Sequence, residues 1–203
     1  MTTPRDLLTV AMDMESSRPL ERGDLSLALA GAELIDLLSA QAIRMDGDHI
    51  VPAHRPTVAD RLLDQAASSL AREAPYESVG DWLWRRGHGL ATAYLAALEA
   101  EGQLTRQHRR WMPFRTGRTV LADSPARRRA ADRWTSHEPI LTALAAAAGI
   151  NDTQPGDPPS VADDAVATVL AAVNDAVREL EAVRQRRAIE KAAFDNIWRG
   201  DGD

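Results

Sequence analysis

The chain of 203 residues contains no cysteine. This absence excludes disulfide bonds, thiolate catalysis and zinc sites built from cysteine. Aromatic residues make up only 4% of the chain, and lysine occurs once, at Lys191, among 24 basic residues. We attribute the preference for arginine to a GC-rich coding sequence, which also indicates a bacterial source. The clustering of arginines in the sequence is therefore evidence about function, whereas the use of arginine in place of lysine is not.

Long apolar runs are also missing. The longest, from Leu144 to Ile150, is far shorter than the ~20 residues that a helix needs to cross a bilayer. The first six residues lack a basic region followed by an apolar core, so we predict no signal peptide and a cytoplasmic protein. With 44% hydrophobic and 27% charged residues, the chain has the composition of a soluble globular protein. Its length predicts a single domain over residues 1–203.

Motifs for catalysis or metal binding are lacking too. The five histidines show no metal-ligand spacing, and the chain has neither a glycine-rich phosphate loop nor a serine elbow. Asp60 and Asp64 share one helix face, which is typical of a solvated helix start. We therefore predict a protein that is not an enzyme and has no metal or cofactor. The histidines are His49, His54, His88, His108 and His137.

What the sequence does contain is a run of helical patterns, so the predicted fold class is mainly α, with one or two short β-hairpins. Asp24, Thr57, Ser78 and Ser124 are predicted N-caps, and Gly102 is a predicted helix end. Pro139 is expected to divide its region into two helices. The predicted helices span residues 4–12, 24–41, 57–73, 78–86, 90–102, 124–138 and 139–149, with hairpins at 43–52 and 103–121.

The C-terminal part of the chain has a different pattern. Residues 151–159 form a polar loop rich in proline and glycine, which is the best candidate for an internal boundary. Residues 160–198 contain neither glycine nor proline, and their apolar residues follow a helical stripe as far as Val183. The stripe loses its phase between Arg184 and Arg187. We therefore expect a break or an exposed helix end there.

The main candidate site is the segment 106–118, whose five arginines accompany three large apolar residues and no acidic residue. The chain as a whole has 30 acidic and 24 basic residues, so this basic segment lies in a protein that is acidic overall. A window extended to residue 133 contains nine arginines and two aspartates. Such a cluster predicts an anionic partner. The residues that we select are Arg109, Arg110, Trp111, Phe114, Arg115 and Arg118.

Several interpretations of this segment remain open. Each arginine near an anionic bilayer contributes about 1 kcal/mol, and Trp111 and Phe114 are suited to the lipid interface, so we favour contact with anionic lipid. Packing between subunits in a homo-oligomer is a second interpretation, and solvated arginines around packed aromatics are a third. A winged-helix-like protein that binds nucleic acid is the alternative of another class. The helix before the segment, residues 90–101, has no outward basic or amide residue with which to read bases.

A second candidate site comprises Trp82, Arg85 and Arg86, which lie on one short predicted helix. A spacing of two residues puts Trp82 and Trp84 on different helix faces, so at most one of them is expected in the core. The other would stand beside Arg85 as a wall for a lipid head group. A tryptophan that packs beneath a loop is the more common explanation of such a pattern.

The order of segments resembles the Golgi phosphoprotein 3 family, which occurs in eukaryotes and in actinobacteria. The resemblance covers residues 5–150, and its matching pieces are residues 25–44, 60–64, 75–83 and 95–104. It implies a mostly helical, non-enzymatic adaptor that binds membranes peripherally through phosphatidylinositol 4-phosphate. It also implies that the hairpin after Leu104 approaches the membrane and neighbouring subunits. Localisation at the inner face of the cell membrane follows from the same resemblance.

The head-group pocket of the eukaryotic members is not reproduced in this sequence. The positions of its tryptophan and arginines fall on Glu21, Ala30, His88 and Ala91. Arg85 and Arg86 lie near the last two and are candidates to replace them. We therefore predict electrostatic docking on anionic phospholipid, with a phosphoinositide as one candidate ligand.

Overall fold

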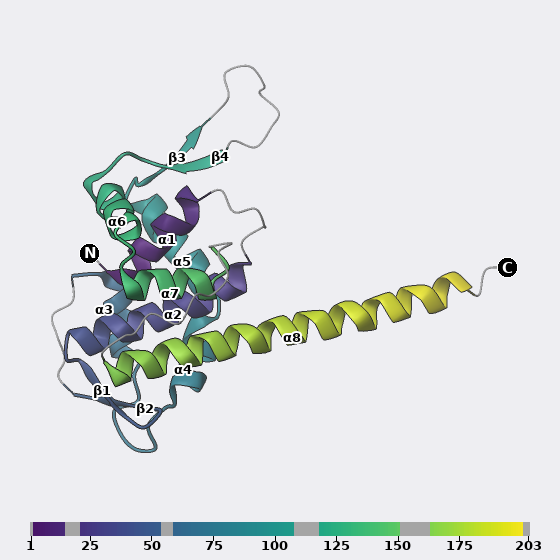
Figure 1. The fold of residues 1–203 in the computed structure, drawn as a ribbon, viewed down its shortest axis with the longest axis horizontal. Coiled ribbons are helices and arrows are strands. Elements are labelled where there is room, and N and C mark those ends of the chain that lie inside the picture. The colour runs from purple at the N-terminus through teal and green to yellow at the C-terminus, as the bar shows by residue number, and fades with distance from the viewer. Residues whose placement is uncertain (1, 15–20, 54–58, 108–117, 151–162, 201–203) are drawn as a thin grey trace.

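The computed structural model describes residues 2–14, 21–53, 59–107, 118–150 and 163–200. Within these ranges the chain forms eight helices and two antiparallel hairpins, which confirms the mainly α class (Figure 1). The helices are α1 (Thr3–Asp13), α2 (Arg22–Ser39), α3 (Arg61–Ser68), α4 (Val79–Gly87), α5 (Leu90–Ala100), α6 (Pro125–Thr135), α7 (Pro139–Ala147) and α8 (Asp164–Gly200). The strands are β1 (Ile43–Asp46), β2 (His49–Pro52), β3 (Leu104–Gln107) and β4 (Arg118–Leu121).

Helix α2 is the centre of the fold, because it is apolar on every side and is surrounded by α1, α4, α5, α7 and α8. A helix that is hydrophobic all round can lie only inside a protein. Helix α8 crosses α2 in the antiparallel direction: a Cβ on Gly23 would meet Leu180, and a Cβ on Gly31 would lie 2.4 Å from Cγ2 of Val173. Glycine at position 31 therefore sets the close approach of these two helices.

The predicted caps agree with the structure at several helix ends. The Ser78 side chain accepts from the amide of Asp81, and the Ser124 side chain accepts from the amide of Arg127. Gly102 follows α5 with a φ of 69°, a conformation that glycine adopts without steric cost. Helices α6 and α7 are separate on the two sides of Pro139, as predicted.

Two predicted helix starts were wrong. Helix α2 begins at Arg22, so Asp24 lies in its first turn, where it pairs with Arg184 of α8 at 2.7 Å. Helix α3 begins at Arg61 and ends at Ser68, and its cap is Asp60, whose carboxylate accepts from the amides of residues 62 and 63. Thr57 lies outside the described residues. Asp60 is also not solvated, since it is largely buried beside Arg5.

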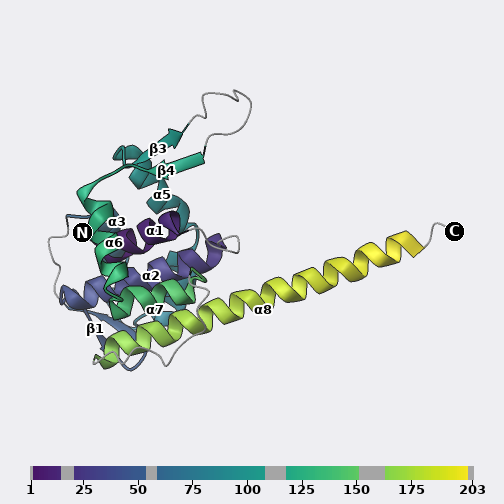
Figure 2. The same ribbon diagram turned by 45° about the horizontal axis from the view of Figure 1, so that its top comes forward.

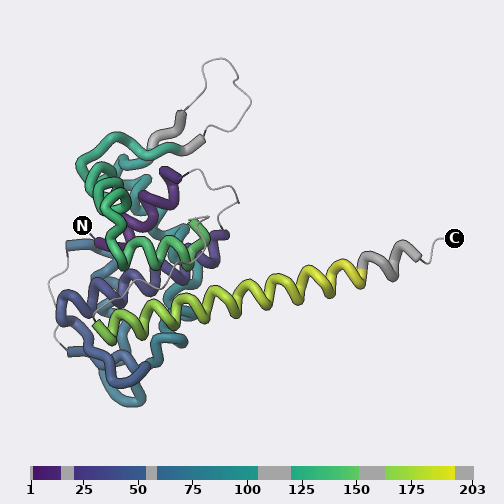
Figure 3. Tube along the Cα trace, viewed as in Figure 1, coloured from purple at the N-terminus to yellow at the C-terminus, as the bar shows by residue number. Residues whose placement is uncertain are grey.

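Helix α8 continues without a break to Gly200, so the expected change after Arg184 is an exposed end (Figures 2 and 3). The alternative, a break in the helix, was wrong. The first half of α8 packs on the body through five buried residues: Val166, Val169, Leu170, Val173 and Ala176. At 1.5 Å per residue its 37 residues span about 55 Å, which is longer than a small domain is wide. The second half therefore extends beyond the body.

Candidate functional site

The arginine-rich segment joins two paired strands. Strands β3 and β4 are antiparallel, with Leu104 opposite Leu121 and Gln107 opposite Arg118. The hairpin projects from the helical body at the end where α1, α5 and α6 lie (Figure 1). The pair of Gln107 and Arg118 therefore forms the outer end of the described hairpin. Arg109, Arg110, Trp111, Phe114 and Arg115 lie outside the described residues, as does the side chain of Arg118, and their predicted role stays a prediction.

The base of the hairpin is fixed to the body. Leu121 is buried and Leu104 packs against the core. The Ala122 amide donates to the Gln103 carbonyl at 2.8 Å, and the Arg127 guanidinium donates to the Leu121 carbonyl at 3.3 Å. These contacts hold the described strand residues in place. The base of the hairpin is thus part of the folded body.

Three of the four arginines that follow the hairpin are paired with carboxylates of the chain. Arg127 lies 2.8 Å from Asp13, and Arg128 lies 3.1 Å from Asp123. Arg133 bridges Asp6 at 2.5 Å and Glu138 at 2.9 Å. Most of these acidic partners lie outside the window of residues 106–133, so a count of charges within that window overstates its positive charge. Within residues 106–118 the sequence has five arginines and no acid, and the side chains of these arginines lie outside the described residues.

The two tryptophans of α4 have different environments. Trp82 is completely buried, and its indole N–H donates to the carbonyl of Ala30 at 3.2 Å. Trp84 keeps 41% of its surface exposed. This confirms that at most one of the pair belongs to the core, and it identifies Trp82 as that residue. Arg85 lies over the Trp82 ring, 5.1 Å from its centroid, and makes two hydrogen bonds of 2.7 and 2.6 Å with Glu77.

Arg86 takes part in a buried polar network. Its Nε and Nη2 atoms each donate to Glu33 at 2.8 Å, and Nη2 also donates to the Leu62 carbonyl at 3.0 Å. The Tyr94 hydroxyl donates to the same Glu33 carboxylate at 3.0 Å. Glu33 is fully buried, and this burial raises its pKa, although Arg86 and Tyr94 oppose the rise. The network joins α2, α4 and α5 and also reaches the C=O of Leu62 in α3.

These contacts bear on the second candidate site. The guanidinium groups of Arg85 and Arg86 already hold Glu77 and Glu33, and Trp82 exposes no surface. A phosphate at this place would have to replace one of those carboxylates. The head-group role of the three residues stays a prediction, and the structure gives each of them a contact within the fold.

Sequence reasoning missed the carboxylates in this region. Glu33 is the one charged residue between Leu25 and Ile35, and a lone acid in a helix that is otherwise apolar is the signal that could have identified a buried partner for a base. Glu77 gives no such signal, because it lies in a polar turn. Its pairing with Arg85 depends on how the chain folds between positions 77 and 85.

The positions that correspond to the eukaryotic pocket differ in their surroundings. Ala30 and Ala91 are buried, and the Ala91 amide donates to the Ser26 hydroxyl at 3.1 Å. Glu21 and His88 are exposed. None of the four carries the permanent positive charge with which an arginine holds a phosphate. The structure thus gives no reason to assign a specific head-group pocket to these positions.

Other classes of site lack support in the described part of the chain. No group of three or more potential metal ligands occurs there, and no helix there has the length and apolarity of a membrane span. The exposed positions of α5 include Thr92, Ala96 and Glu99, with no base or amide among the exposed residues of that helix. A recognition helix for nucleic acid needs such groups. The winged-helix alternative therefore gains nothing from α5.

Comparison with known proteins gives one match. A family model described as Golgi phosphoprotein 3 (GPP34) matches residues 4–191, which extends beyond the resemblance seen in residues 5–150 and includes most of α8. No curated protein sequence matches the chain. The family match confirms the resemblance drawn from the order of the segments.

Proposed function

The chain belongs to the Golgi phosphoprotein 3 family, and from this membership we propose that it is a non-catalytic protein that docks on anionic membrane lipid. Residues 106–118 are the contact in this proposal. The family makes a lipid-associated role the first hypothesis to test. The charge distribution of this chain indicates which of its segments would meet the lipid.

One observation carries the proposal. In the window of residues 106–133, Arg127, Arg128 and Arg133 are neutralised by carboxylates, whereas the sequence of residues 106–118 supplies five arginines and no acid. The segment begins in β3 and ends in β4, and these two strands pair in an antiparallel hairpin at one end of the helical body (Figure 1). An acidic protein that approaches an anionic surface is repelled except where its positive charge leads. The hairpin is a part of the molecule that satisfies this condition.

The chemistry of the segment suits a bilayer surface. Each arginine close to an anionic membrane contributes about 1 kcal/mol. Trp111 and Phe114 would add apolar contact at the interface, where an aromatic ring is favoured. Glu21, Ala30, His88 and Ala91 supply no head-group pocket, so we propose selection by negative charge. A phosphoinositide then binds because it is highly charged. The protein would act at the inner face of the cell membrane.

Vesicle sedimentation tests this proposal. The full chain is mixed with phosphatidylcholine vesicles that either contain or lack phosphatidylglycerol, and the bound fraction is measured. We expect binding only to the anionic vesicles, and we expect it to be lost in the triple variant R109A/R110A/R115A. The control R44A/R72A/R178A removes three exposed arginines elsewhere and so makes the same change in net charge.

Two results would reject the proposal. One is equal binding to neutral and anionic vesicles. The other is equal loss in the triple variant and its control, since net charge and not the segment would then be responsible. A parallel titration with duplex DNA tests the nucleic-acid alternative, which would be preferred if DNA bound more tightly than anionic vesicles at the same salt concentration.

A further inference from the structure

The second half of α8 is a projection of its own. We call residues Ala182–Phe194 the distal arm. The helix leaves the body near Arg184, whose guanidinium pairs with Asp24 at the start of α2, and it then extends away from the other helices (Figures 1 and 2). Its isolation is physically costly, because a helix of this length is marginal in water without a partner. Packing on this body therefore does not account for the sequence of the arm.

Exposed apolar side chains concentrate on the distal arm. Among the described residues, the large hydrophobic side chains classed as exposed are Trp84 on α4 and three residues of the arm: Val183, Ile189 and Phe194. Ile189 is 70% exposed and Phe194 is 60% exposed. Single apolar residues on a surface are ordinary, but Val183 and Phe194 lie on one side of this projecting helix, whereas Ile189 lies on the opposite side. Val183 and Phe194 therefore give one face of the arm an apolar component.

The charge of α8 changes where the helix leaves the body. Residues 164–180 contain three acids and one base. The distal arm contains four bases and one acid, Glu190, and one of these bases, Arg184, is paired with Asp24 and Glu181. A basic helix that also carries exposed Val and Phe side chains has the composition of a segment that lies on an anionic surface. The bases are Arg184, Arg186, Arg187 and Lys191.

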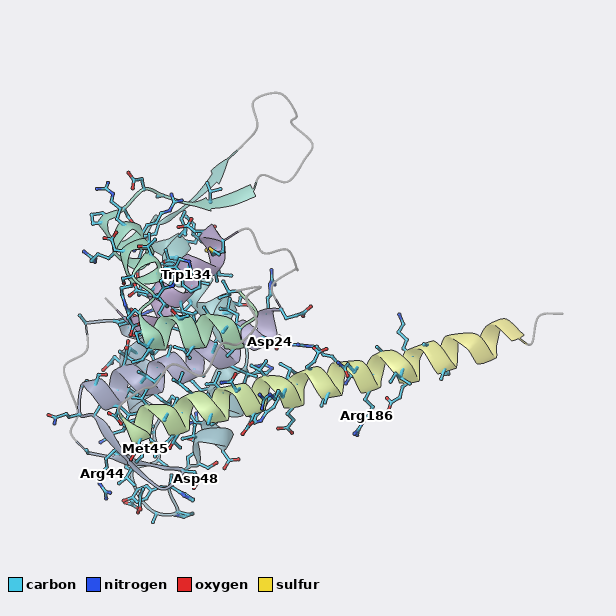
Figure 4. All side chains as sticks on the ribbon, viewed as in Figure 1. Asp24, Arg44, Met45, Asp48, Trp134 and Arg186 are labelled. Atoms are coloured by element: carbon cyan, nitrogen blue, oxygen red, sulfur yellow. The ribbon has the colours of Figure 1, made fainter. Side chains whose placement is uncertain are left out.

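The direction of one face follows from helical spacing. Positions 173, 176, 180, 184, 187, 191 and 194 are three or four residues apart, so their side chains lie on one side of the helix. Val173 and Ala176 are buried against the body, which fixes that side. Arg187, Lys191 and Phe194 therefore continue the body-facing side past the edge of the body. Arg186 points to the other side (Figure 4).

The β3–β4 hairpin and the distal arm are separate projections. In Figure 1 strands β3 and β4 lie above the α8 axis, on the side of α1, α6 and α7, and the arm extends away at an angle to them. Helix α4 and the β1–β2 hairpin lie on the other side of α8 (Figure 1).

We propose that this face of the distal arm, carrying Arg187, Lys191 and Phe194, is a second contact with the anionic bilayer. The proposal rests on the proposed function of residues 106–118 and adds a partner surface on a different element. With two basic projections on the membrane, the acidic body stays away from the lipid charge. Two separate contacts also fix the orientation of the protein on the membrane, which a single hairpin cannot do.

A second copy of the chain is a poorer occupant for this face. Two arms laid side by side would bring together two segments that each carry Arg186, Arg187 and Lys191 against one acid, and like charges at close range repel. An anionic bilayer complements this charge, and it accepts Phe194 at its interface. The face therefore fits a lipid surface better than it fits its own duplicate.

The test compares matched double variants of the full chain on vesicles of phosphatidylcholine with phosphatidylglycerol. R187A/K191A removes two bases from the face, and R72A/R178A removes two exposed bases elsewhere, one of them on the body half of α8. Alanine favours helix, so circular dichroism should show no loss of helix in either variant. We expect R187A/K191A to weaken partitioning about tenfold or more, and the control to change it less than about twofold.

The outcomes separate this inference from the proposed function. If R187A/K191A and its control behave alike while R109A/R110A/R115A loses binding, the arm is not a contact and the proposed function stands. If the wild-type chain does not prefer anionic vesicles, both fail. If sedimentation equilibrium without lipid shows a dimer that V183S/F194S dissociates with no change in vesicle binding, the face is an interface between copies and the proposal is wrong.

A labelling experiment gives a second readout, because the chain has no cysteine of its own. A polarity-sensitive fluorophore is attached to E190C, close to the proposed face, or to A192C, on the opposite side of the helix. We expect anionic vesicles to shift the emission of the label at position 190 to the blue by more than that at position 192. Equal shifts at the two positions, or none, would contradict the proposed orientation.

Discussion

Replacement of Arg86 by alanine tests whether the fold uses this arginine for stability or for a lipid head group. The change removes both 2.8 Å hydrogen bonds to Glu33 and the 3.0 Å bond to the Leu62 carbonyl. Glu33 is fully buried and would keep only the Tyr94 hydroxyl as a donor. Loss of one partner of a buried ion pair typically costs about 3–5 kcal/mol. We therefore expect R86A to lower the free energy of unfolding by that amount.

The double variant E33L/R86L should be less harmful than R86A, because it leaves no buried charge. The cost that only the double variant has is the Tyr94 hydroxyl, which loses its acceptor, at about 1–3 kcal/mol, because the Leu62 carbonyl loses the Arg86 donor in both variants. R85A is the control, since the pair of Arg85 with Glu77 is half exposed and such pairs contribute about 0–1 kcal/mol. Urea titrations followed by circular dichroism give the free energy of unfolding of each variant.

The reasoning is refuted if R86A costs less than about 1 kcal/mol, or if E33L/R86L is as unstable as R86A, because an unpaired buried charge would then not be the cause. Vesicle binding of folded R86A supplies the second measurement. We expect it to equal that of the wild type. A large loss of binding with an intact fold would instead support a head-group role for Arg86.

Three further predictions follow from the buried contacts. G31A should destabilise the protein by about 1–3 kcal/mol in urea titration, because the new Cβ would lie 2.4 Å from Cγ2 of Val173, a stiff β-branched side chain. R133A should cost about 3 kcal/mol, since it leaves the buried Asp6 carboxylate without its 2.5 Å partner, and a neutral D6N background should reduce that cost. Burial raises the pKa values of Asp6, Glu33 and Asp36 above the usual 3.8 and 4.5, so the folded state takes up protons first on acidification. Their contribution to stability should thus be greatest below those usual values and fall as the pH rises towards the raised ones, which urea midpoints at several pH values would show.

Local signals in the sequence predicted most elements of the fold. Ser78, Ser124, Gly102 and Pro139 mark helix ends because their effects depend on neighbouring residues only. The predicted start of α3 was wrong because its cap depends on a distant residue. Asp60 caps the helix while it also pairs with Arg5, which is far away in the chain. A competition between Thr57 and Asp60 as caps cannot be decided from the segment alone.

The candidate sites were harder to predict, because the partners of an arginine are distant in sequence. Arg86 lies 53 positions from Glu33, and Arg184 lies 160 positions from Asp24. No residue near Arg86 in the sequence indicates that its partner is the carboxylate of Glu33. A cluster of bases can be seen in a sequence, but whether each base is already paired depends on the tertiary structure. That is why the charge counted over residues 106–133 overstated the free positive charge, since Arg127, Arg128 and Arg133 are paired with carboxylates.

Arginines that hold buried carboxylates and arginines in the proposed lipid contacts should therefore differ in which measurement their removal changes, stability or vesicle binding. Arg86 and Arg133 hold buried carboxylates, so their removal should reduce stability and leave vesicle binding intact once the protein is folded. The proposed lipid contacts, Arg109, Arg110 and Arg115 together with Arg187 in the distal arm, should show the reverse, because an arginine near an anionic bilayer contributes about 1 kcal/mol to binding. The two effects have different causes, desolvation of a partner in one case and long-range attraction in the other. Added salt should therefore abolish the binding effects and leave the losses of stability from buried pairs largely unchanged.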